Sequence, residues 1–416
     1  THDWNMLNNR KDLGLSTARV FGLAPGTDLY FHRYFSTRSR RERLTLGLHP
    51  TIWYNDAGGI TLGVRAREDY LGRYPQNVTL VSQSVGWGVD GGVTETNTFM
   101  RLRNPVRLRS PNVSQTLDVF HVEGRYGLTA TVERSRREHL TFGPTWSGGL
   151  TLQWLHPDDV RFLDPGYYDD VGTVELAAAW GVTTTRGRWR LGLRATSAGG
   201  IAYNRDGLAA SGRPELDPFY GRVTIEGTAR RALTGRLGLG VRLFAGVAGA
   251  DEPAAKQRQI YFQGADPLEQ LRNPFLRSRG ALLVGEDVHY QAPGGAGVRG
   301  VDSRISSRAI VALNLELERT LFARPQSRLF NRIALAAFTD LSHGFGGPIQ
   351  PDTGDEIRFL GDAGVGLRAE HRIGDTRFLT RFDLPLFVSR PGLAQDRSPD
   401  DEELAFRWVF SFEPGL

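Results

Sequence analysis

The stretch 236–244, "RLGLGVRLF", decides how the rest of this sequence is interpreted. Apolar residues alternate with arginine or glycine: Leu237, Leu239, Val241 and Leu243 fall on one side, and Arg236, Gly238, Gly240 and Arg242 fall on the other. Successive side chains of a β-strand point to opposite faces, so a period of two residues predicts a strand. One face of that strand is apolar, and the other is polar and glycine-rich.

The same alternation recurs along the chain. In "AFRWVFSF" near the C-terminus, one face holds four aromatic residues, namely Phe406, Trp408, Phe410 and Phe412. Seventeen segments alternate in this way: 27–35, 42–54, 58–68, 78–89, 97–109, 115–123, 125–134, 138–155, 171–185, 188–202, 217–231, 235–248, 303–321, 328–341, 356–372, 376–388 and 403–412. Bacterial barrels made of one chain have an even number of strands, so we expect about sixteen.

Segment length and aromatic placement favour a membrane-spanning barrel over a soluble antiparallel sandwich, which is the alternative. Many segments run to ten residues or more, whereas an average globular strand has about five or six and about ten cross a bilayer at a tilt. Aromatic residues gather at segment ends, as interfacial girdles require: Trp53, Tyr54, Tyr70, Tyr74, Trp146, Trp154, Trp180, Trp189, Tyr203, Phe219 and Tyr220. The sequence therefore predicts an all-β protein, a transmembrane antiparallel β-barrel.

Composition excludes several other classes. Aromatic residues make up 10% of the chain and charged residues 23%, which is too apolar for a disordered chain and too polar for a helical membrane protein. The longest uncharged run, 139–157, contains Gly143, Pro144, Gly148 and Gly149 and cannot be a spanning helix. Since there is no cysteine, disulfides and thiolate metal sites are excluded.

The expected partners follow from the barrel prediction and from charge. The net charge of +5 could favour a polyanion, but only Lys11 and Lys256 are lysines and the arginines are dispersed, so no nucleic-acid partner is expected. A bacterial outer-membrane barrel would contact phospholipid and lipopolysaccharide. We expect residues 1–26 to lead into a barrel domain over 27–416. The sequence begins without a methionine or an apolar leader, so it is a mature protein or a piece of a longer one.

Motifs for catalysis are absent from the sequence. Neither "HExxH" nor "GxSxG" occurs, and "GGAGVRG" at 294–300 lacks the Gly-Lys-Ser/Thr of a phosphate loop. The acidic runs "YYDD" at 167–170 and "DDEE" at 400–403 could hold a divalent cation, although such loops are more often only solvated. No catalytic residue, cofactor or metal is predicted.

The long connection 251–301 is predicted to fold into the lumen. In "IALAAFTD", Phe338 and Asp340 lie on the polar, inward face of their segment. A carboxylate in a partly dehydrated lumen needs a partner, and Arg299 can supply a bidentate one, with Glu316 or Glu318 sharing its guanidinium. Glycines such as Gly300 permit the tight backbone of a packed loop. The alternative is a disordered extracellular loop.

These residues also resemble a known family. "GGAGVRG", "ALNLELERTLF", "IALAAFTD", "GVGLR" and "TRFDLPLF" resemble the C-terminal half of the barrel in the bacterial surface antigen superfamily, over residues 290–412. That superfamily contains BamA-like assembly factors, TamA-like translocation factors and two-partner secretion transporters. The resemblance implies a sixteen-stranded barrel in which a "[VI]RG[FY]" loop arginine meets the aspartate of "FxDxG". Here the matches are Arg299 and Asp340, with Val301 in place of the aromatic and Ser342 in place of the glycine.

Two functions remain open on this resemblance. One is protein translocation or insertion, in which a weak seam between the first and last strands opens to pass client proteins. The other is a passive anchor or pore for a larger envelope protein or complex, because residues 44–69 also resemble barrels that follow gluzincin-type aminopeptidase domains. No POTRA repeats precede the barrel in this sequence, and four residues follow Phe412. Repeats upstream in the full gene would favour the first function, and an upstream "HExxH" domain would favour the second.

Overall fold

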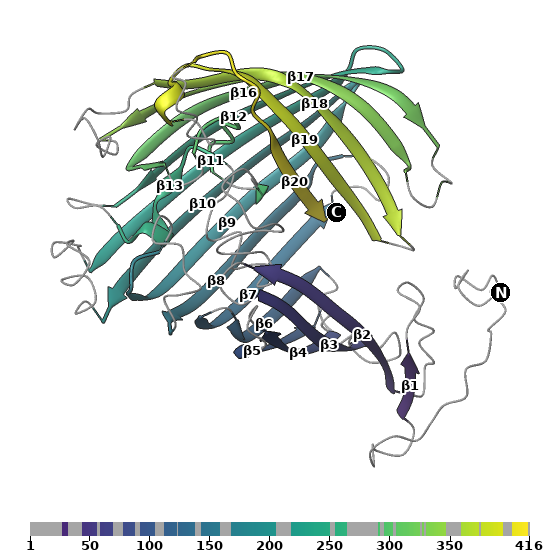
Figure 1. Cartoon of the computed structure of the whole chain (residues 1–416), viewed down its shortest axis with the longest axis vertical. Coiled ribbons are helices and arrows are strands. Elements are labelled where there is room, and N and C mark those ends of the chain that lie inside the picture. The colour runs from purple at the N-terminus through teal and green to yellow at the C-terminus, as the bar shows by residue number, and fades with distance from the viewer. Residues whose placement is uncertain are drawn as a thin grey trace.

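The computed structural model is almost entirely β-sheet (Figure 1). It describes residues 27–31, 44–55, 59–69, 78–87, 92–104, 112–122, 124–137, 143–158, 168–204, 218–249, 254–263, 290–291, 295–302, 305–324, 327, 330–346, 359–373, 376–393 and 402–414. Among these residues, no helix is long and apolar enough to span a membrane.

One antiparallel meander forms the body of the described chain. Fifteen consecutive antiparallel pairings join sixteen strands. They are β2 (Leu44–Asn55), β3 (Gly59–Asp69), β4 (Val78–Trp87), β5 (Val93–Asn104), β6 (Val113–Val122), β7 (Arg125–Arg137), β8 (Thr145–Pro157), β9 (Gly172–Arg186), β10 (Trp189–Tyr203), β11 (Phe219–Ala232), β12 (Leu237–Ala248), β16 (Ala309–Ala323), β17 (Arg332–Phe345), β18 (Phe359–Ile373), β19 (Thr376–Val388) and β20 (Val409–Pro414). The predicted all-β fold of about sixteen strands is confirmed.

The remaining elements are short. The first of the seventeen predicted segments forms β1 (Thr27–Phe31), which pairs with β2 in parallel and so lies outside the antiparallel meander. The connection between β12 and β16 holds the 3-10 turn η3 (Lys256–Arg258) and the two-residue strands β13 (Ile260–Tyr261), β14 (Tyr290–Gln291) and β15 (Ser306–Ser307). A second 3-10 turn, η4 (Pro391–Leu393), follows β19.

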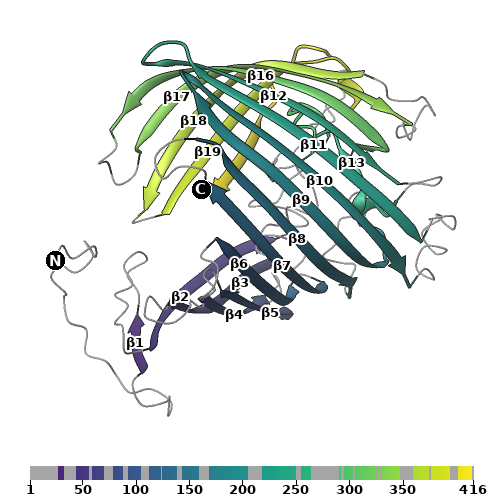
Figure 2. The ribbon, with the colours of Figure 1, turned by 180° about the vertical axis from the view of Figure 1, so that it is seen from behind.

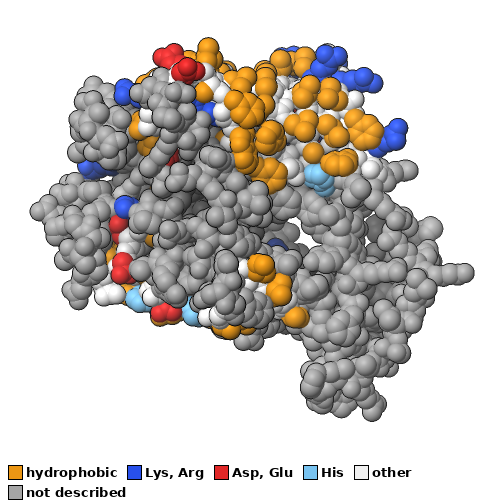
Figure 3. All heavy atoms as spheres, viewed as in Figure 1, with side chains coloured by type: hydrophobic (Ala, Val, Ile, Leu, Met, Phe, Trp, Pro, Cys, Tyr) orange, Lys and Arg blue, Asp and Glu red, His pale blue; other side chains and the backbone are white. Residues whose placement is uncertain are grey.

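The meander curls around a lumen (Figures 1 and 2). Apolar side chains lie on its outer surface. Leu150 and Leu152 of β8 are 56% and 45% exposed, Leu243 of β12 is 57% exposed and Leu335 of β17 is 49% exposed. Figure 3 shows hydrophobic side chains gathered over β18, β19 and the adjoining part of the sheet. A water-soluble protein would bury these residues, whereas a membrane-spanning sheet presents them to lipid.

Aromatic side chains flank this apolar surface along β8. Towards one end of the strand, the rings of Trp146 and Trp180 lie 5.7 Å apart. Towards the other end, the indole N–H of Trp154 donates a hydrogen bond to the hydroxyl of Tyr203. Eight residues of strand separate the two tryptophans, about 26 Å along the strand at about 3.3 Å per residue. At the strand tilt of about 40° that is usual in outer-membrane barrels, this is about 20 Å along the membrane normal, somewhat less than their apolar band of about 25 Å.

From β8 to β20, the two ends of the meander differ in the length of their connections, whereas between β2 and β8 every connection has eight residues or fewer. At one end, long connections follow β8, β10, β12, β17 and β19. At the other end, β9 and β10 are joined by Gly187 and Arg188 alone, with Gly187 at a φ of +60°, and β18 and β19 are joined by two residues. Bacterial barrels place short turns in the periplasm and long loops outside. We call this second end the short-turn end.

Two stretches of the connection between β12 and β16 pack inside the curled sheet, as the sequence predicts. These stretches, 254–263 and 295–302, are named the plug. Their apolar side chains are buried against inward-facing residues of β12, β16 and β18, in a cluster that includes Phe244, Ile260, Phe262, Val298, Val301, Ile310 and Leu360. Because both stretches join one apolar core, they are anchored within the lumen rather than extended into solvent.

The first and last strands of the meander are not paired with each other in the described part of the chain. The edge of β2 pairs with β1, from Thr27 with Leu44 to Phe31 with Leu48. The edge of β20 pairs with β14, at Tyr290 with Phe410 and Gln291 with Ser411. Both of these pairings are parallel. The gap between β2 and β20 is called the seam.

The terminal strand is shorter than the sequence predicts. β20 begins at Val409, so Phe410 and Phe412 lie in the strand, while Phe406 and Trp408 precede it. Phe406 is 72% exposed, and the ring of Trp408 stacks on Phe382 of β19 with centroids 5.8 Å apart. The alternating pattern continues through 403–408, but only an isolated bridge between Phe387 and Leu404 pairs this part with β19.

Candidate functional site: a charge cluster that ties the plug to the wall

Two glycines set the backbone of the plug at the candidate site. Gly295 and Gly297 have φ values of +53° and +78°, a region that side-chain-bearing residues rarely adopt. A Cβ at Gly295 would lie 2.0 Å from the carbonyl oxygen of Gln263. The backbone N–H groups of Ala296 and Val298 then donate to the carbonyls of Tyr261 and Phe262, both at 2.8 Å. The two stretches of the plug are therefore hydrogen-bonded to each other, and the next residue, Arg299, is presented to the wall.

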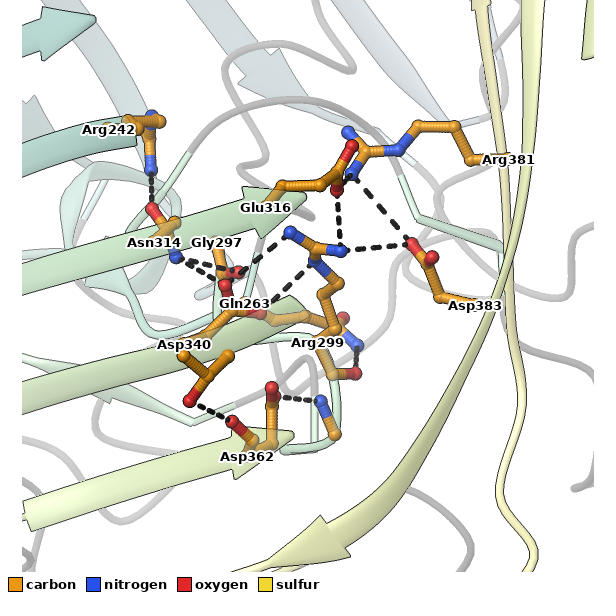
Figure 4. Close-up of polar contacts among 12 residues, drawn as sticks. Arg242, Gln263, Gly297, Arg299, Asn314, Glu316, Asp340, Asp362, Arg381 and Asp383 are labelled. Carbon is orange, nitrogen blue, oxygen red and sulfur yellow. Dashed lines mark hydrogen bonds and ion pairs between the residues drawn. The ribbon is translucent and has the colours of Figure 1, made fainter. Parts of the chain in front are cut away.

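The guanidinium of Arg299 lies among three carboxylates from β16, β17 and β19 (Figure 4). Its Nε is 3.1 Å from Oδ2 of Asp340, and its Nη1 is 2.9 Å from Oε2 of Glu316 and 3.7 Å from Oδ2 of Asp383. The guanidinium also stands 4.0 Å from the ring centroid of Phe338. Opposite charge and a cation–π contact thus hold one side chain of the plug against three strands.

Arg299 remains positively charged in this setting. Burial alone would lower the pKa of its guanidinium, but the charges of Asp340, Asp383 and Glu316 raise that pKa above its ordinary value. Asp340 itself is fully buried. Removing one member of such a buried pair leaves an uncompensated charge and costs about 3–5 kcal/mol.

The backbone beside Arg299 makes a second contact with the wall. The N–H of Gly300 donates to Oδ2 of Asp362 on β18, at 2.6 Å. Asp362 lies directly opposite Asp340 in the register of β17 and β18. A Cβ at Gly300 would lie 2.7 Å from Val388 and 3.0 Å from Pro385. This close approach requires a glycine, which is the reason that Gly300 follows Arg299.

Glu316 connects Arg299 to two further arginines of the wall. Oε2 of Glu316 accepts hydrogen bonds from Arg368 of β18 at 2.7 Å and from Arg381 of β19 at 3.2 Å. Arg368 also pairs with Asp383, and both of these side chains are buried. The cluster therefore alternates positive and negative groups across four adjacent strands, β16 to β19, with Arg299 as its contribution from the plug.

A third contact joins the plug to β12 and β16. Arg242 donates to the carbonyls of Gly295 at 2.7 Å and Ala296 at 3.0 Å. It also donates to Oδ1 of Asn314 at 2.9 Å, and Asn314 donates to Oδ1 of Asp340 at 3.0 Å. The plug carbonyls and the Asp340 carboxylate are thus bridged by one arginine and one asparagine (Figure 4).

A separate group of contacts ties the other stretch of the plug to β8 and β9. The fully buried side chain of Arg258 donates to Gln153 at 2.9 Å and to Thr173 at 2.8 Å, and it lies 3.2 Å from Glu175. The carboxylate of Asp169 accepts a hydrogen bond from the backbone N–H of Lys256 at 2.8 Å. The plug is therefore attached to two different parts of the wall.

The structure sorts the residues singled out in the sequence. Arg299, Gly300, Phe338, Asp340 and Glu316 come together, whereas Glu318 pairs with Arg332 instead of Arg299. Sequence reasoning did not select the following members of the two attachments: Arg242, Asn314, Asp362, Arg368, Arg381, Asp383, Arg258, Gln153, Thr173 and Glu175. Most of the wall residues lie on inward strand faces, where the period of two could have found them, but Arg258 follows no periodic pattern.

The acidic runs do not form a cation site in the described part of the chain. No group of three His, Cys, Asp or Glu side chains suited to a metal ion occurs there. The carboxylate of Asp169 of "YYDD" instead accepts a hydrogen bond from the backbone N–H of Lys256, and the backbone N–H of Asp169 donates to Oε1 of Gln257. Of "DDEE", only Glu402 and Glu403 lie within the described residues, and their carbonyl oxygens accept hydrogen bonds from Arg407.

Comparisons with known proteins find likeness in structure alone. No protein-family model matches the sequence, and no curated protein matches it. Solved structures that resemble the chain include BamA from Haemophilus ducreyi lacking POTRA domains 1–3, at 14% identity and a TM-score of 0.46, covering 90% of this chain and 71% of that one. CdiB from Escherichia coli has 13% identity and a TM-score of 0.45, covering 90% and 68%. CdiB from Acinetobacter baumannii has 12% identity and a TM-score of 0.44, covering 91% and 64%. Likenesses this remote assign neither a function nor a family.

Proposed function

We propose that this chain is a bacterial outer-membrane β-barrel that helps other polypeptides to cross or enter the membrane through its seam. The plug keeps the lumen closed while the seam engages client strands. Envelope client proteins and the phospholipid and lipopolysaccharide around the barrel are the partners that this function implies. The resemblance of residues 290–412 to the bacterial surface antigen superfamily agrees with this proposal.

The outer surface supports the membrane location. Leucines are exposed on it between two aromatic groups that lie towards opposite ends of β8, as a lipid-facing surface between two interfaces requires. In lipid, a β-sheet pairs all of its backbone N–H and C=O groups only when it closes into a barrel. The strand edges at the seam are therefore the weak point of this wall.

The observation that carries the proposal is the state of those edges. In the described chain, β2 and β20 each pair with a short parallel strand and not with each other. An edge strand with unpaired N–H and C=O groups is a template for an added strand. The replacement of the five-residue β1 or the two-residue β14 by a client strand would lose few hydrogen bonds.

Pulse-chase photocrosslinking in cells tests this proposal. A photoreactive phenylalanine analogue would replace Phe412 in β20 or Thr27 in β1, with Leu243 on the outer face of β12 as the matched control. We expect both seam positions, but not Leu243, to crosslink newly synthesised outer-membrane proteins and to lose them during the chase. Equal crosslinking at all three positions, or adducts that persist through the chase, would contradict translocation through the seam.

The second candidate is a passive anchor or pore. Its support is the double attachment of the plug, which fastens the lumen contents to β8 and β9 through Arg258 and to β16 through β19 through Arg299. A structure fastened in this way suits a membrane domain that carries another protein. The complete coding sequence separates the two candidates, since POTRA repeats upstream favour translocation and a zinc-peptidase domain upstream favours an anchor.

A further inference from the structure

Below the plug, the lumen contains a cavity of about 770 Å³. Its roof includes Gly297 and Arg299 of the plug, and its walls come from β10 to β12 and from β16 to β19. The turns at Arg188 and at Thr234 to Arg236 reach its lining, so it adjoins the short-turn end. Cavities of about 300–1,000 Å³ are the usual size of small-molecule sites.

The charge of this lining is strongly one-sided. Ten arginines and four glutamates line the cavity. On the β16 to β19 side, the positive charges are neutralised locally: Arg332 pairs with Glu318 and Glu370, and Arg368 and Arg381 pair with Glu316. The arginines of that half of the wall are already paired with carboxylates, so few of their N–H groups are left to bind a ligand.

The β10 and β11 side is different. Arg190 of β10 and Arg230 of β11 occupy directly opposed positions in the strand register. The alternation of each strand turns both side chains into the lumen, because Leu191 and Leu193 on β10 and Val223 and Ile225 on β11 are exposed on the outer face. Neither arginine forms an ion pair or a hydrogen bond with a side chain in the part of the chain that the structure describes.

Two more arginines stand at the mouth beside this pair. Arg188 lies in the turn between β9 and β10, and Arg236 lies in the turn between β11 and β12. Both are exposed and line the cavity. Like charges directly opposite each other in a sheet are destabilising, and four guanidinium groups around a cleft concentrate positive potential there. An anion that bridges Arg190 and Arg230 would remove this repulsion.

We propose that the β10 and β11 wall of this cavity is a binding site for a small phosphate-bearing anion that enters from the short-turn end. Arg190 and Arg230 are its primary ligands, and Arg188 and Arg236 attract the anion at the mouth. The planar fork of arginine matches two oxygens of a phosphate group. The site stands on its own residues and does not depend on whether polypeptides pass the seam.

Titration calorimetry on the full chain in detergent tests the site, with inorganic pyrophosphate as the probe at low salt. Arg190→Gln and Arg230→Gln each remove one charged hydrogen-bond donor to the phosphate oxygens. The expected result is a dissociation constant raised about tenfold or more by either change. Arg186→Gln on the outward face of β9 is the matched control, because it removes the same charge two residues from Arg188, and it should leave binding unchanged.

Two further measurements make the result decisive. The variant Arg190→Lys keeps the charge and loses the fork, so we expect binding weaker than in the unchanged chain and stronger than in Arg190→Gln. Phosphatidylglycerol in the micelles, in place of pyrophosphate, separates a lipid headgroup from a soluble phosphate, and only the soluble probe should bind. The absence of pyrophosphate binding, or an equal loss of binding in Arg186→Gln, overturns the proposal. Binding of phosphatidylglycerol alone overturns entry from the short-turn end.

Discussion

Arg299 and Asp340 are 41 residues apart in the chain, and inside the barrel the Nε of the first lies 3.1 Å from an oxygen of the second. The contact joins the plug to β17 in the middle of the wall. Since the Asp340 side chain is fully buried, a positive partner offsets the cost of removing its carboxyl group from water. We infer that the contact holds the plug inside the lumen.

Arg299→Ala is expected to release this stretch of the plug. Stability should fall by about 3–5 kcal/mol, because Asp340 and Glu316 then lose a buried positive partner. Single-channel conductance in planar bilayers should rise, and large antibiotics should enter cells more readily. Asp340→Ala should give the same phenotype, and the double variant should be no more open than either single one, since both remove one interaction.

The control for this cycle is Arg136→Ala, which removes an exposed arginine from β7, far along the meander from β16 to β19. It should alter neither conductance nor antibiotic entry. If the effects of Arg299→Ala and Asp340→Ala add fully in the double variant, the two residues act separately and the inferred role of their contact is wrong.

Gly295→Ala should loosen the plug without any change of charge. The left-handed backbone at φ +53° costs a non-glycine residue about 1–2 kcal/mol, and the new Cβ would also collide with the carbonyl of Gln263. Limited proteolysis of the plug should therefore speed up. Gly199→Ala on β10, where a Cβ meets nothing within 4 Å, should leave the proteolysis rate unchanged, and an equal increase there would argue against a local backbone cause.

Substitutions on β12 should report which face contacts lipid. Leu243 is 57% exposed at the middle of the strand, so Leu243→Arg should destabilise folding into lipid vesicles by about 2–4 kcal/mol. Leu239→Arg, nearer the strand end, should cost less. Gly238→Arg faces the lumen opposite Glu318 and should have the smallest effect in urea titrations. The reverse order among the three variants would contradict the assignment of faces.

The second attachment of the plug should contribute independently of the first. Arg258→Ala removes the contacts with Glu175, Gln153 and Thr173 from a fully buried site, and we expect a loss of about 3–5 kcal/mol. Arg258 and Arg299 share no partner among the contacts described above, so the losses in unfolding free energy should add in the double variant. A double variant no less stable than Arg299→Ala alone would show that the two attachments form one unit.

The strands could be predicted because a single rule applies to most of them. Each of the seventeen alternating segments overlaps a strand, and Ala334, Ala336, Phe338 and Asp340 of β17 all lie on the buried, inward face that the period of two assigns them. What the pattern could not give is pairing. β1 and the segment before β20 also alternate, but β1 pairs in parallel and residues 405–408 form no strand, because pairing depends on neighbours rather than on periodicity.

An irregular strand shows a second limit. The register of β18 and β19 shifts between Ala363 and Val365, where β19 carries one extra residue. Beyond this bulge the faces exchange, so that Val388 is fully buried while Leu386 is exposed. A strict period of two carried through this point assigns both residues to the outer face, which is right for Leu386 and wrong for Val388. Of the candidate site, the contact between Arg299 and Asp340 was predicted from the family resemblance together with charge and strand face. The buried contacts of Arg258 depend on tertiary packing, which no local sequence pattern records.

The double attachment of the plug has a mechanical consequence for the whole cylinder. Arg258 is bound to β8 and β9, and Arg299 is bound to β16, β17 and β19, so the plug links two separate parts of the wall. Widening the barrel at the seam must move these two parts of the wall apart and stretch the plug between its two attachments. A force that moves β2 away from β20 therefore also strains the contacts of Arg258 and Arg299 with the wall. Opening of the seam and release of the plug are then coupled movements.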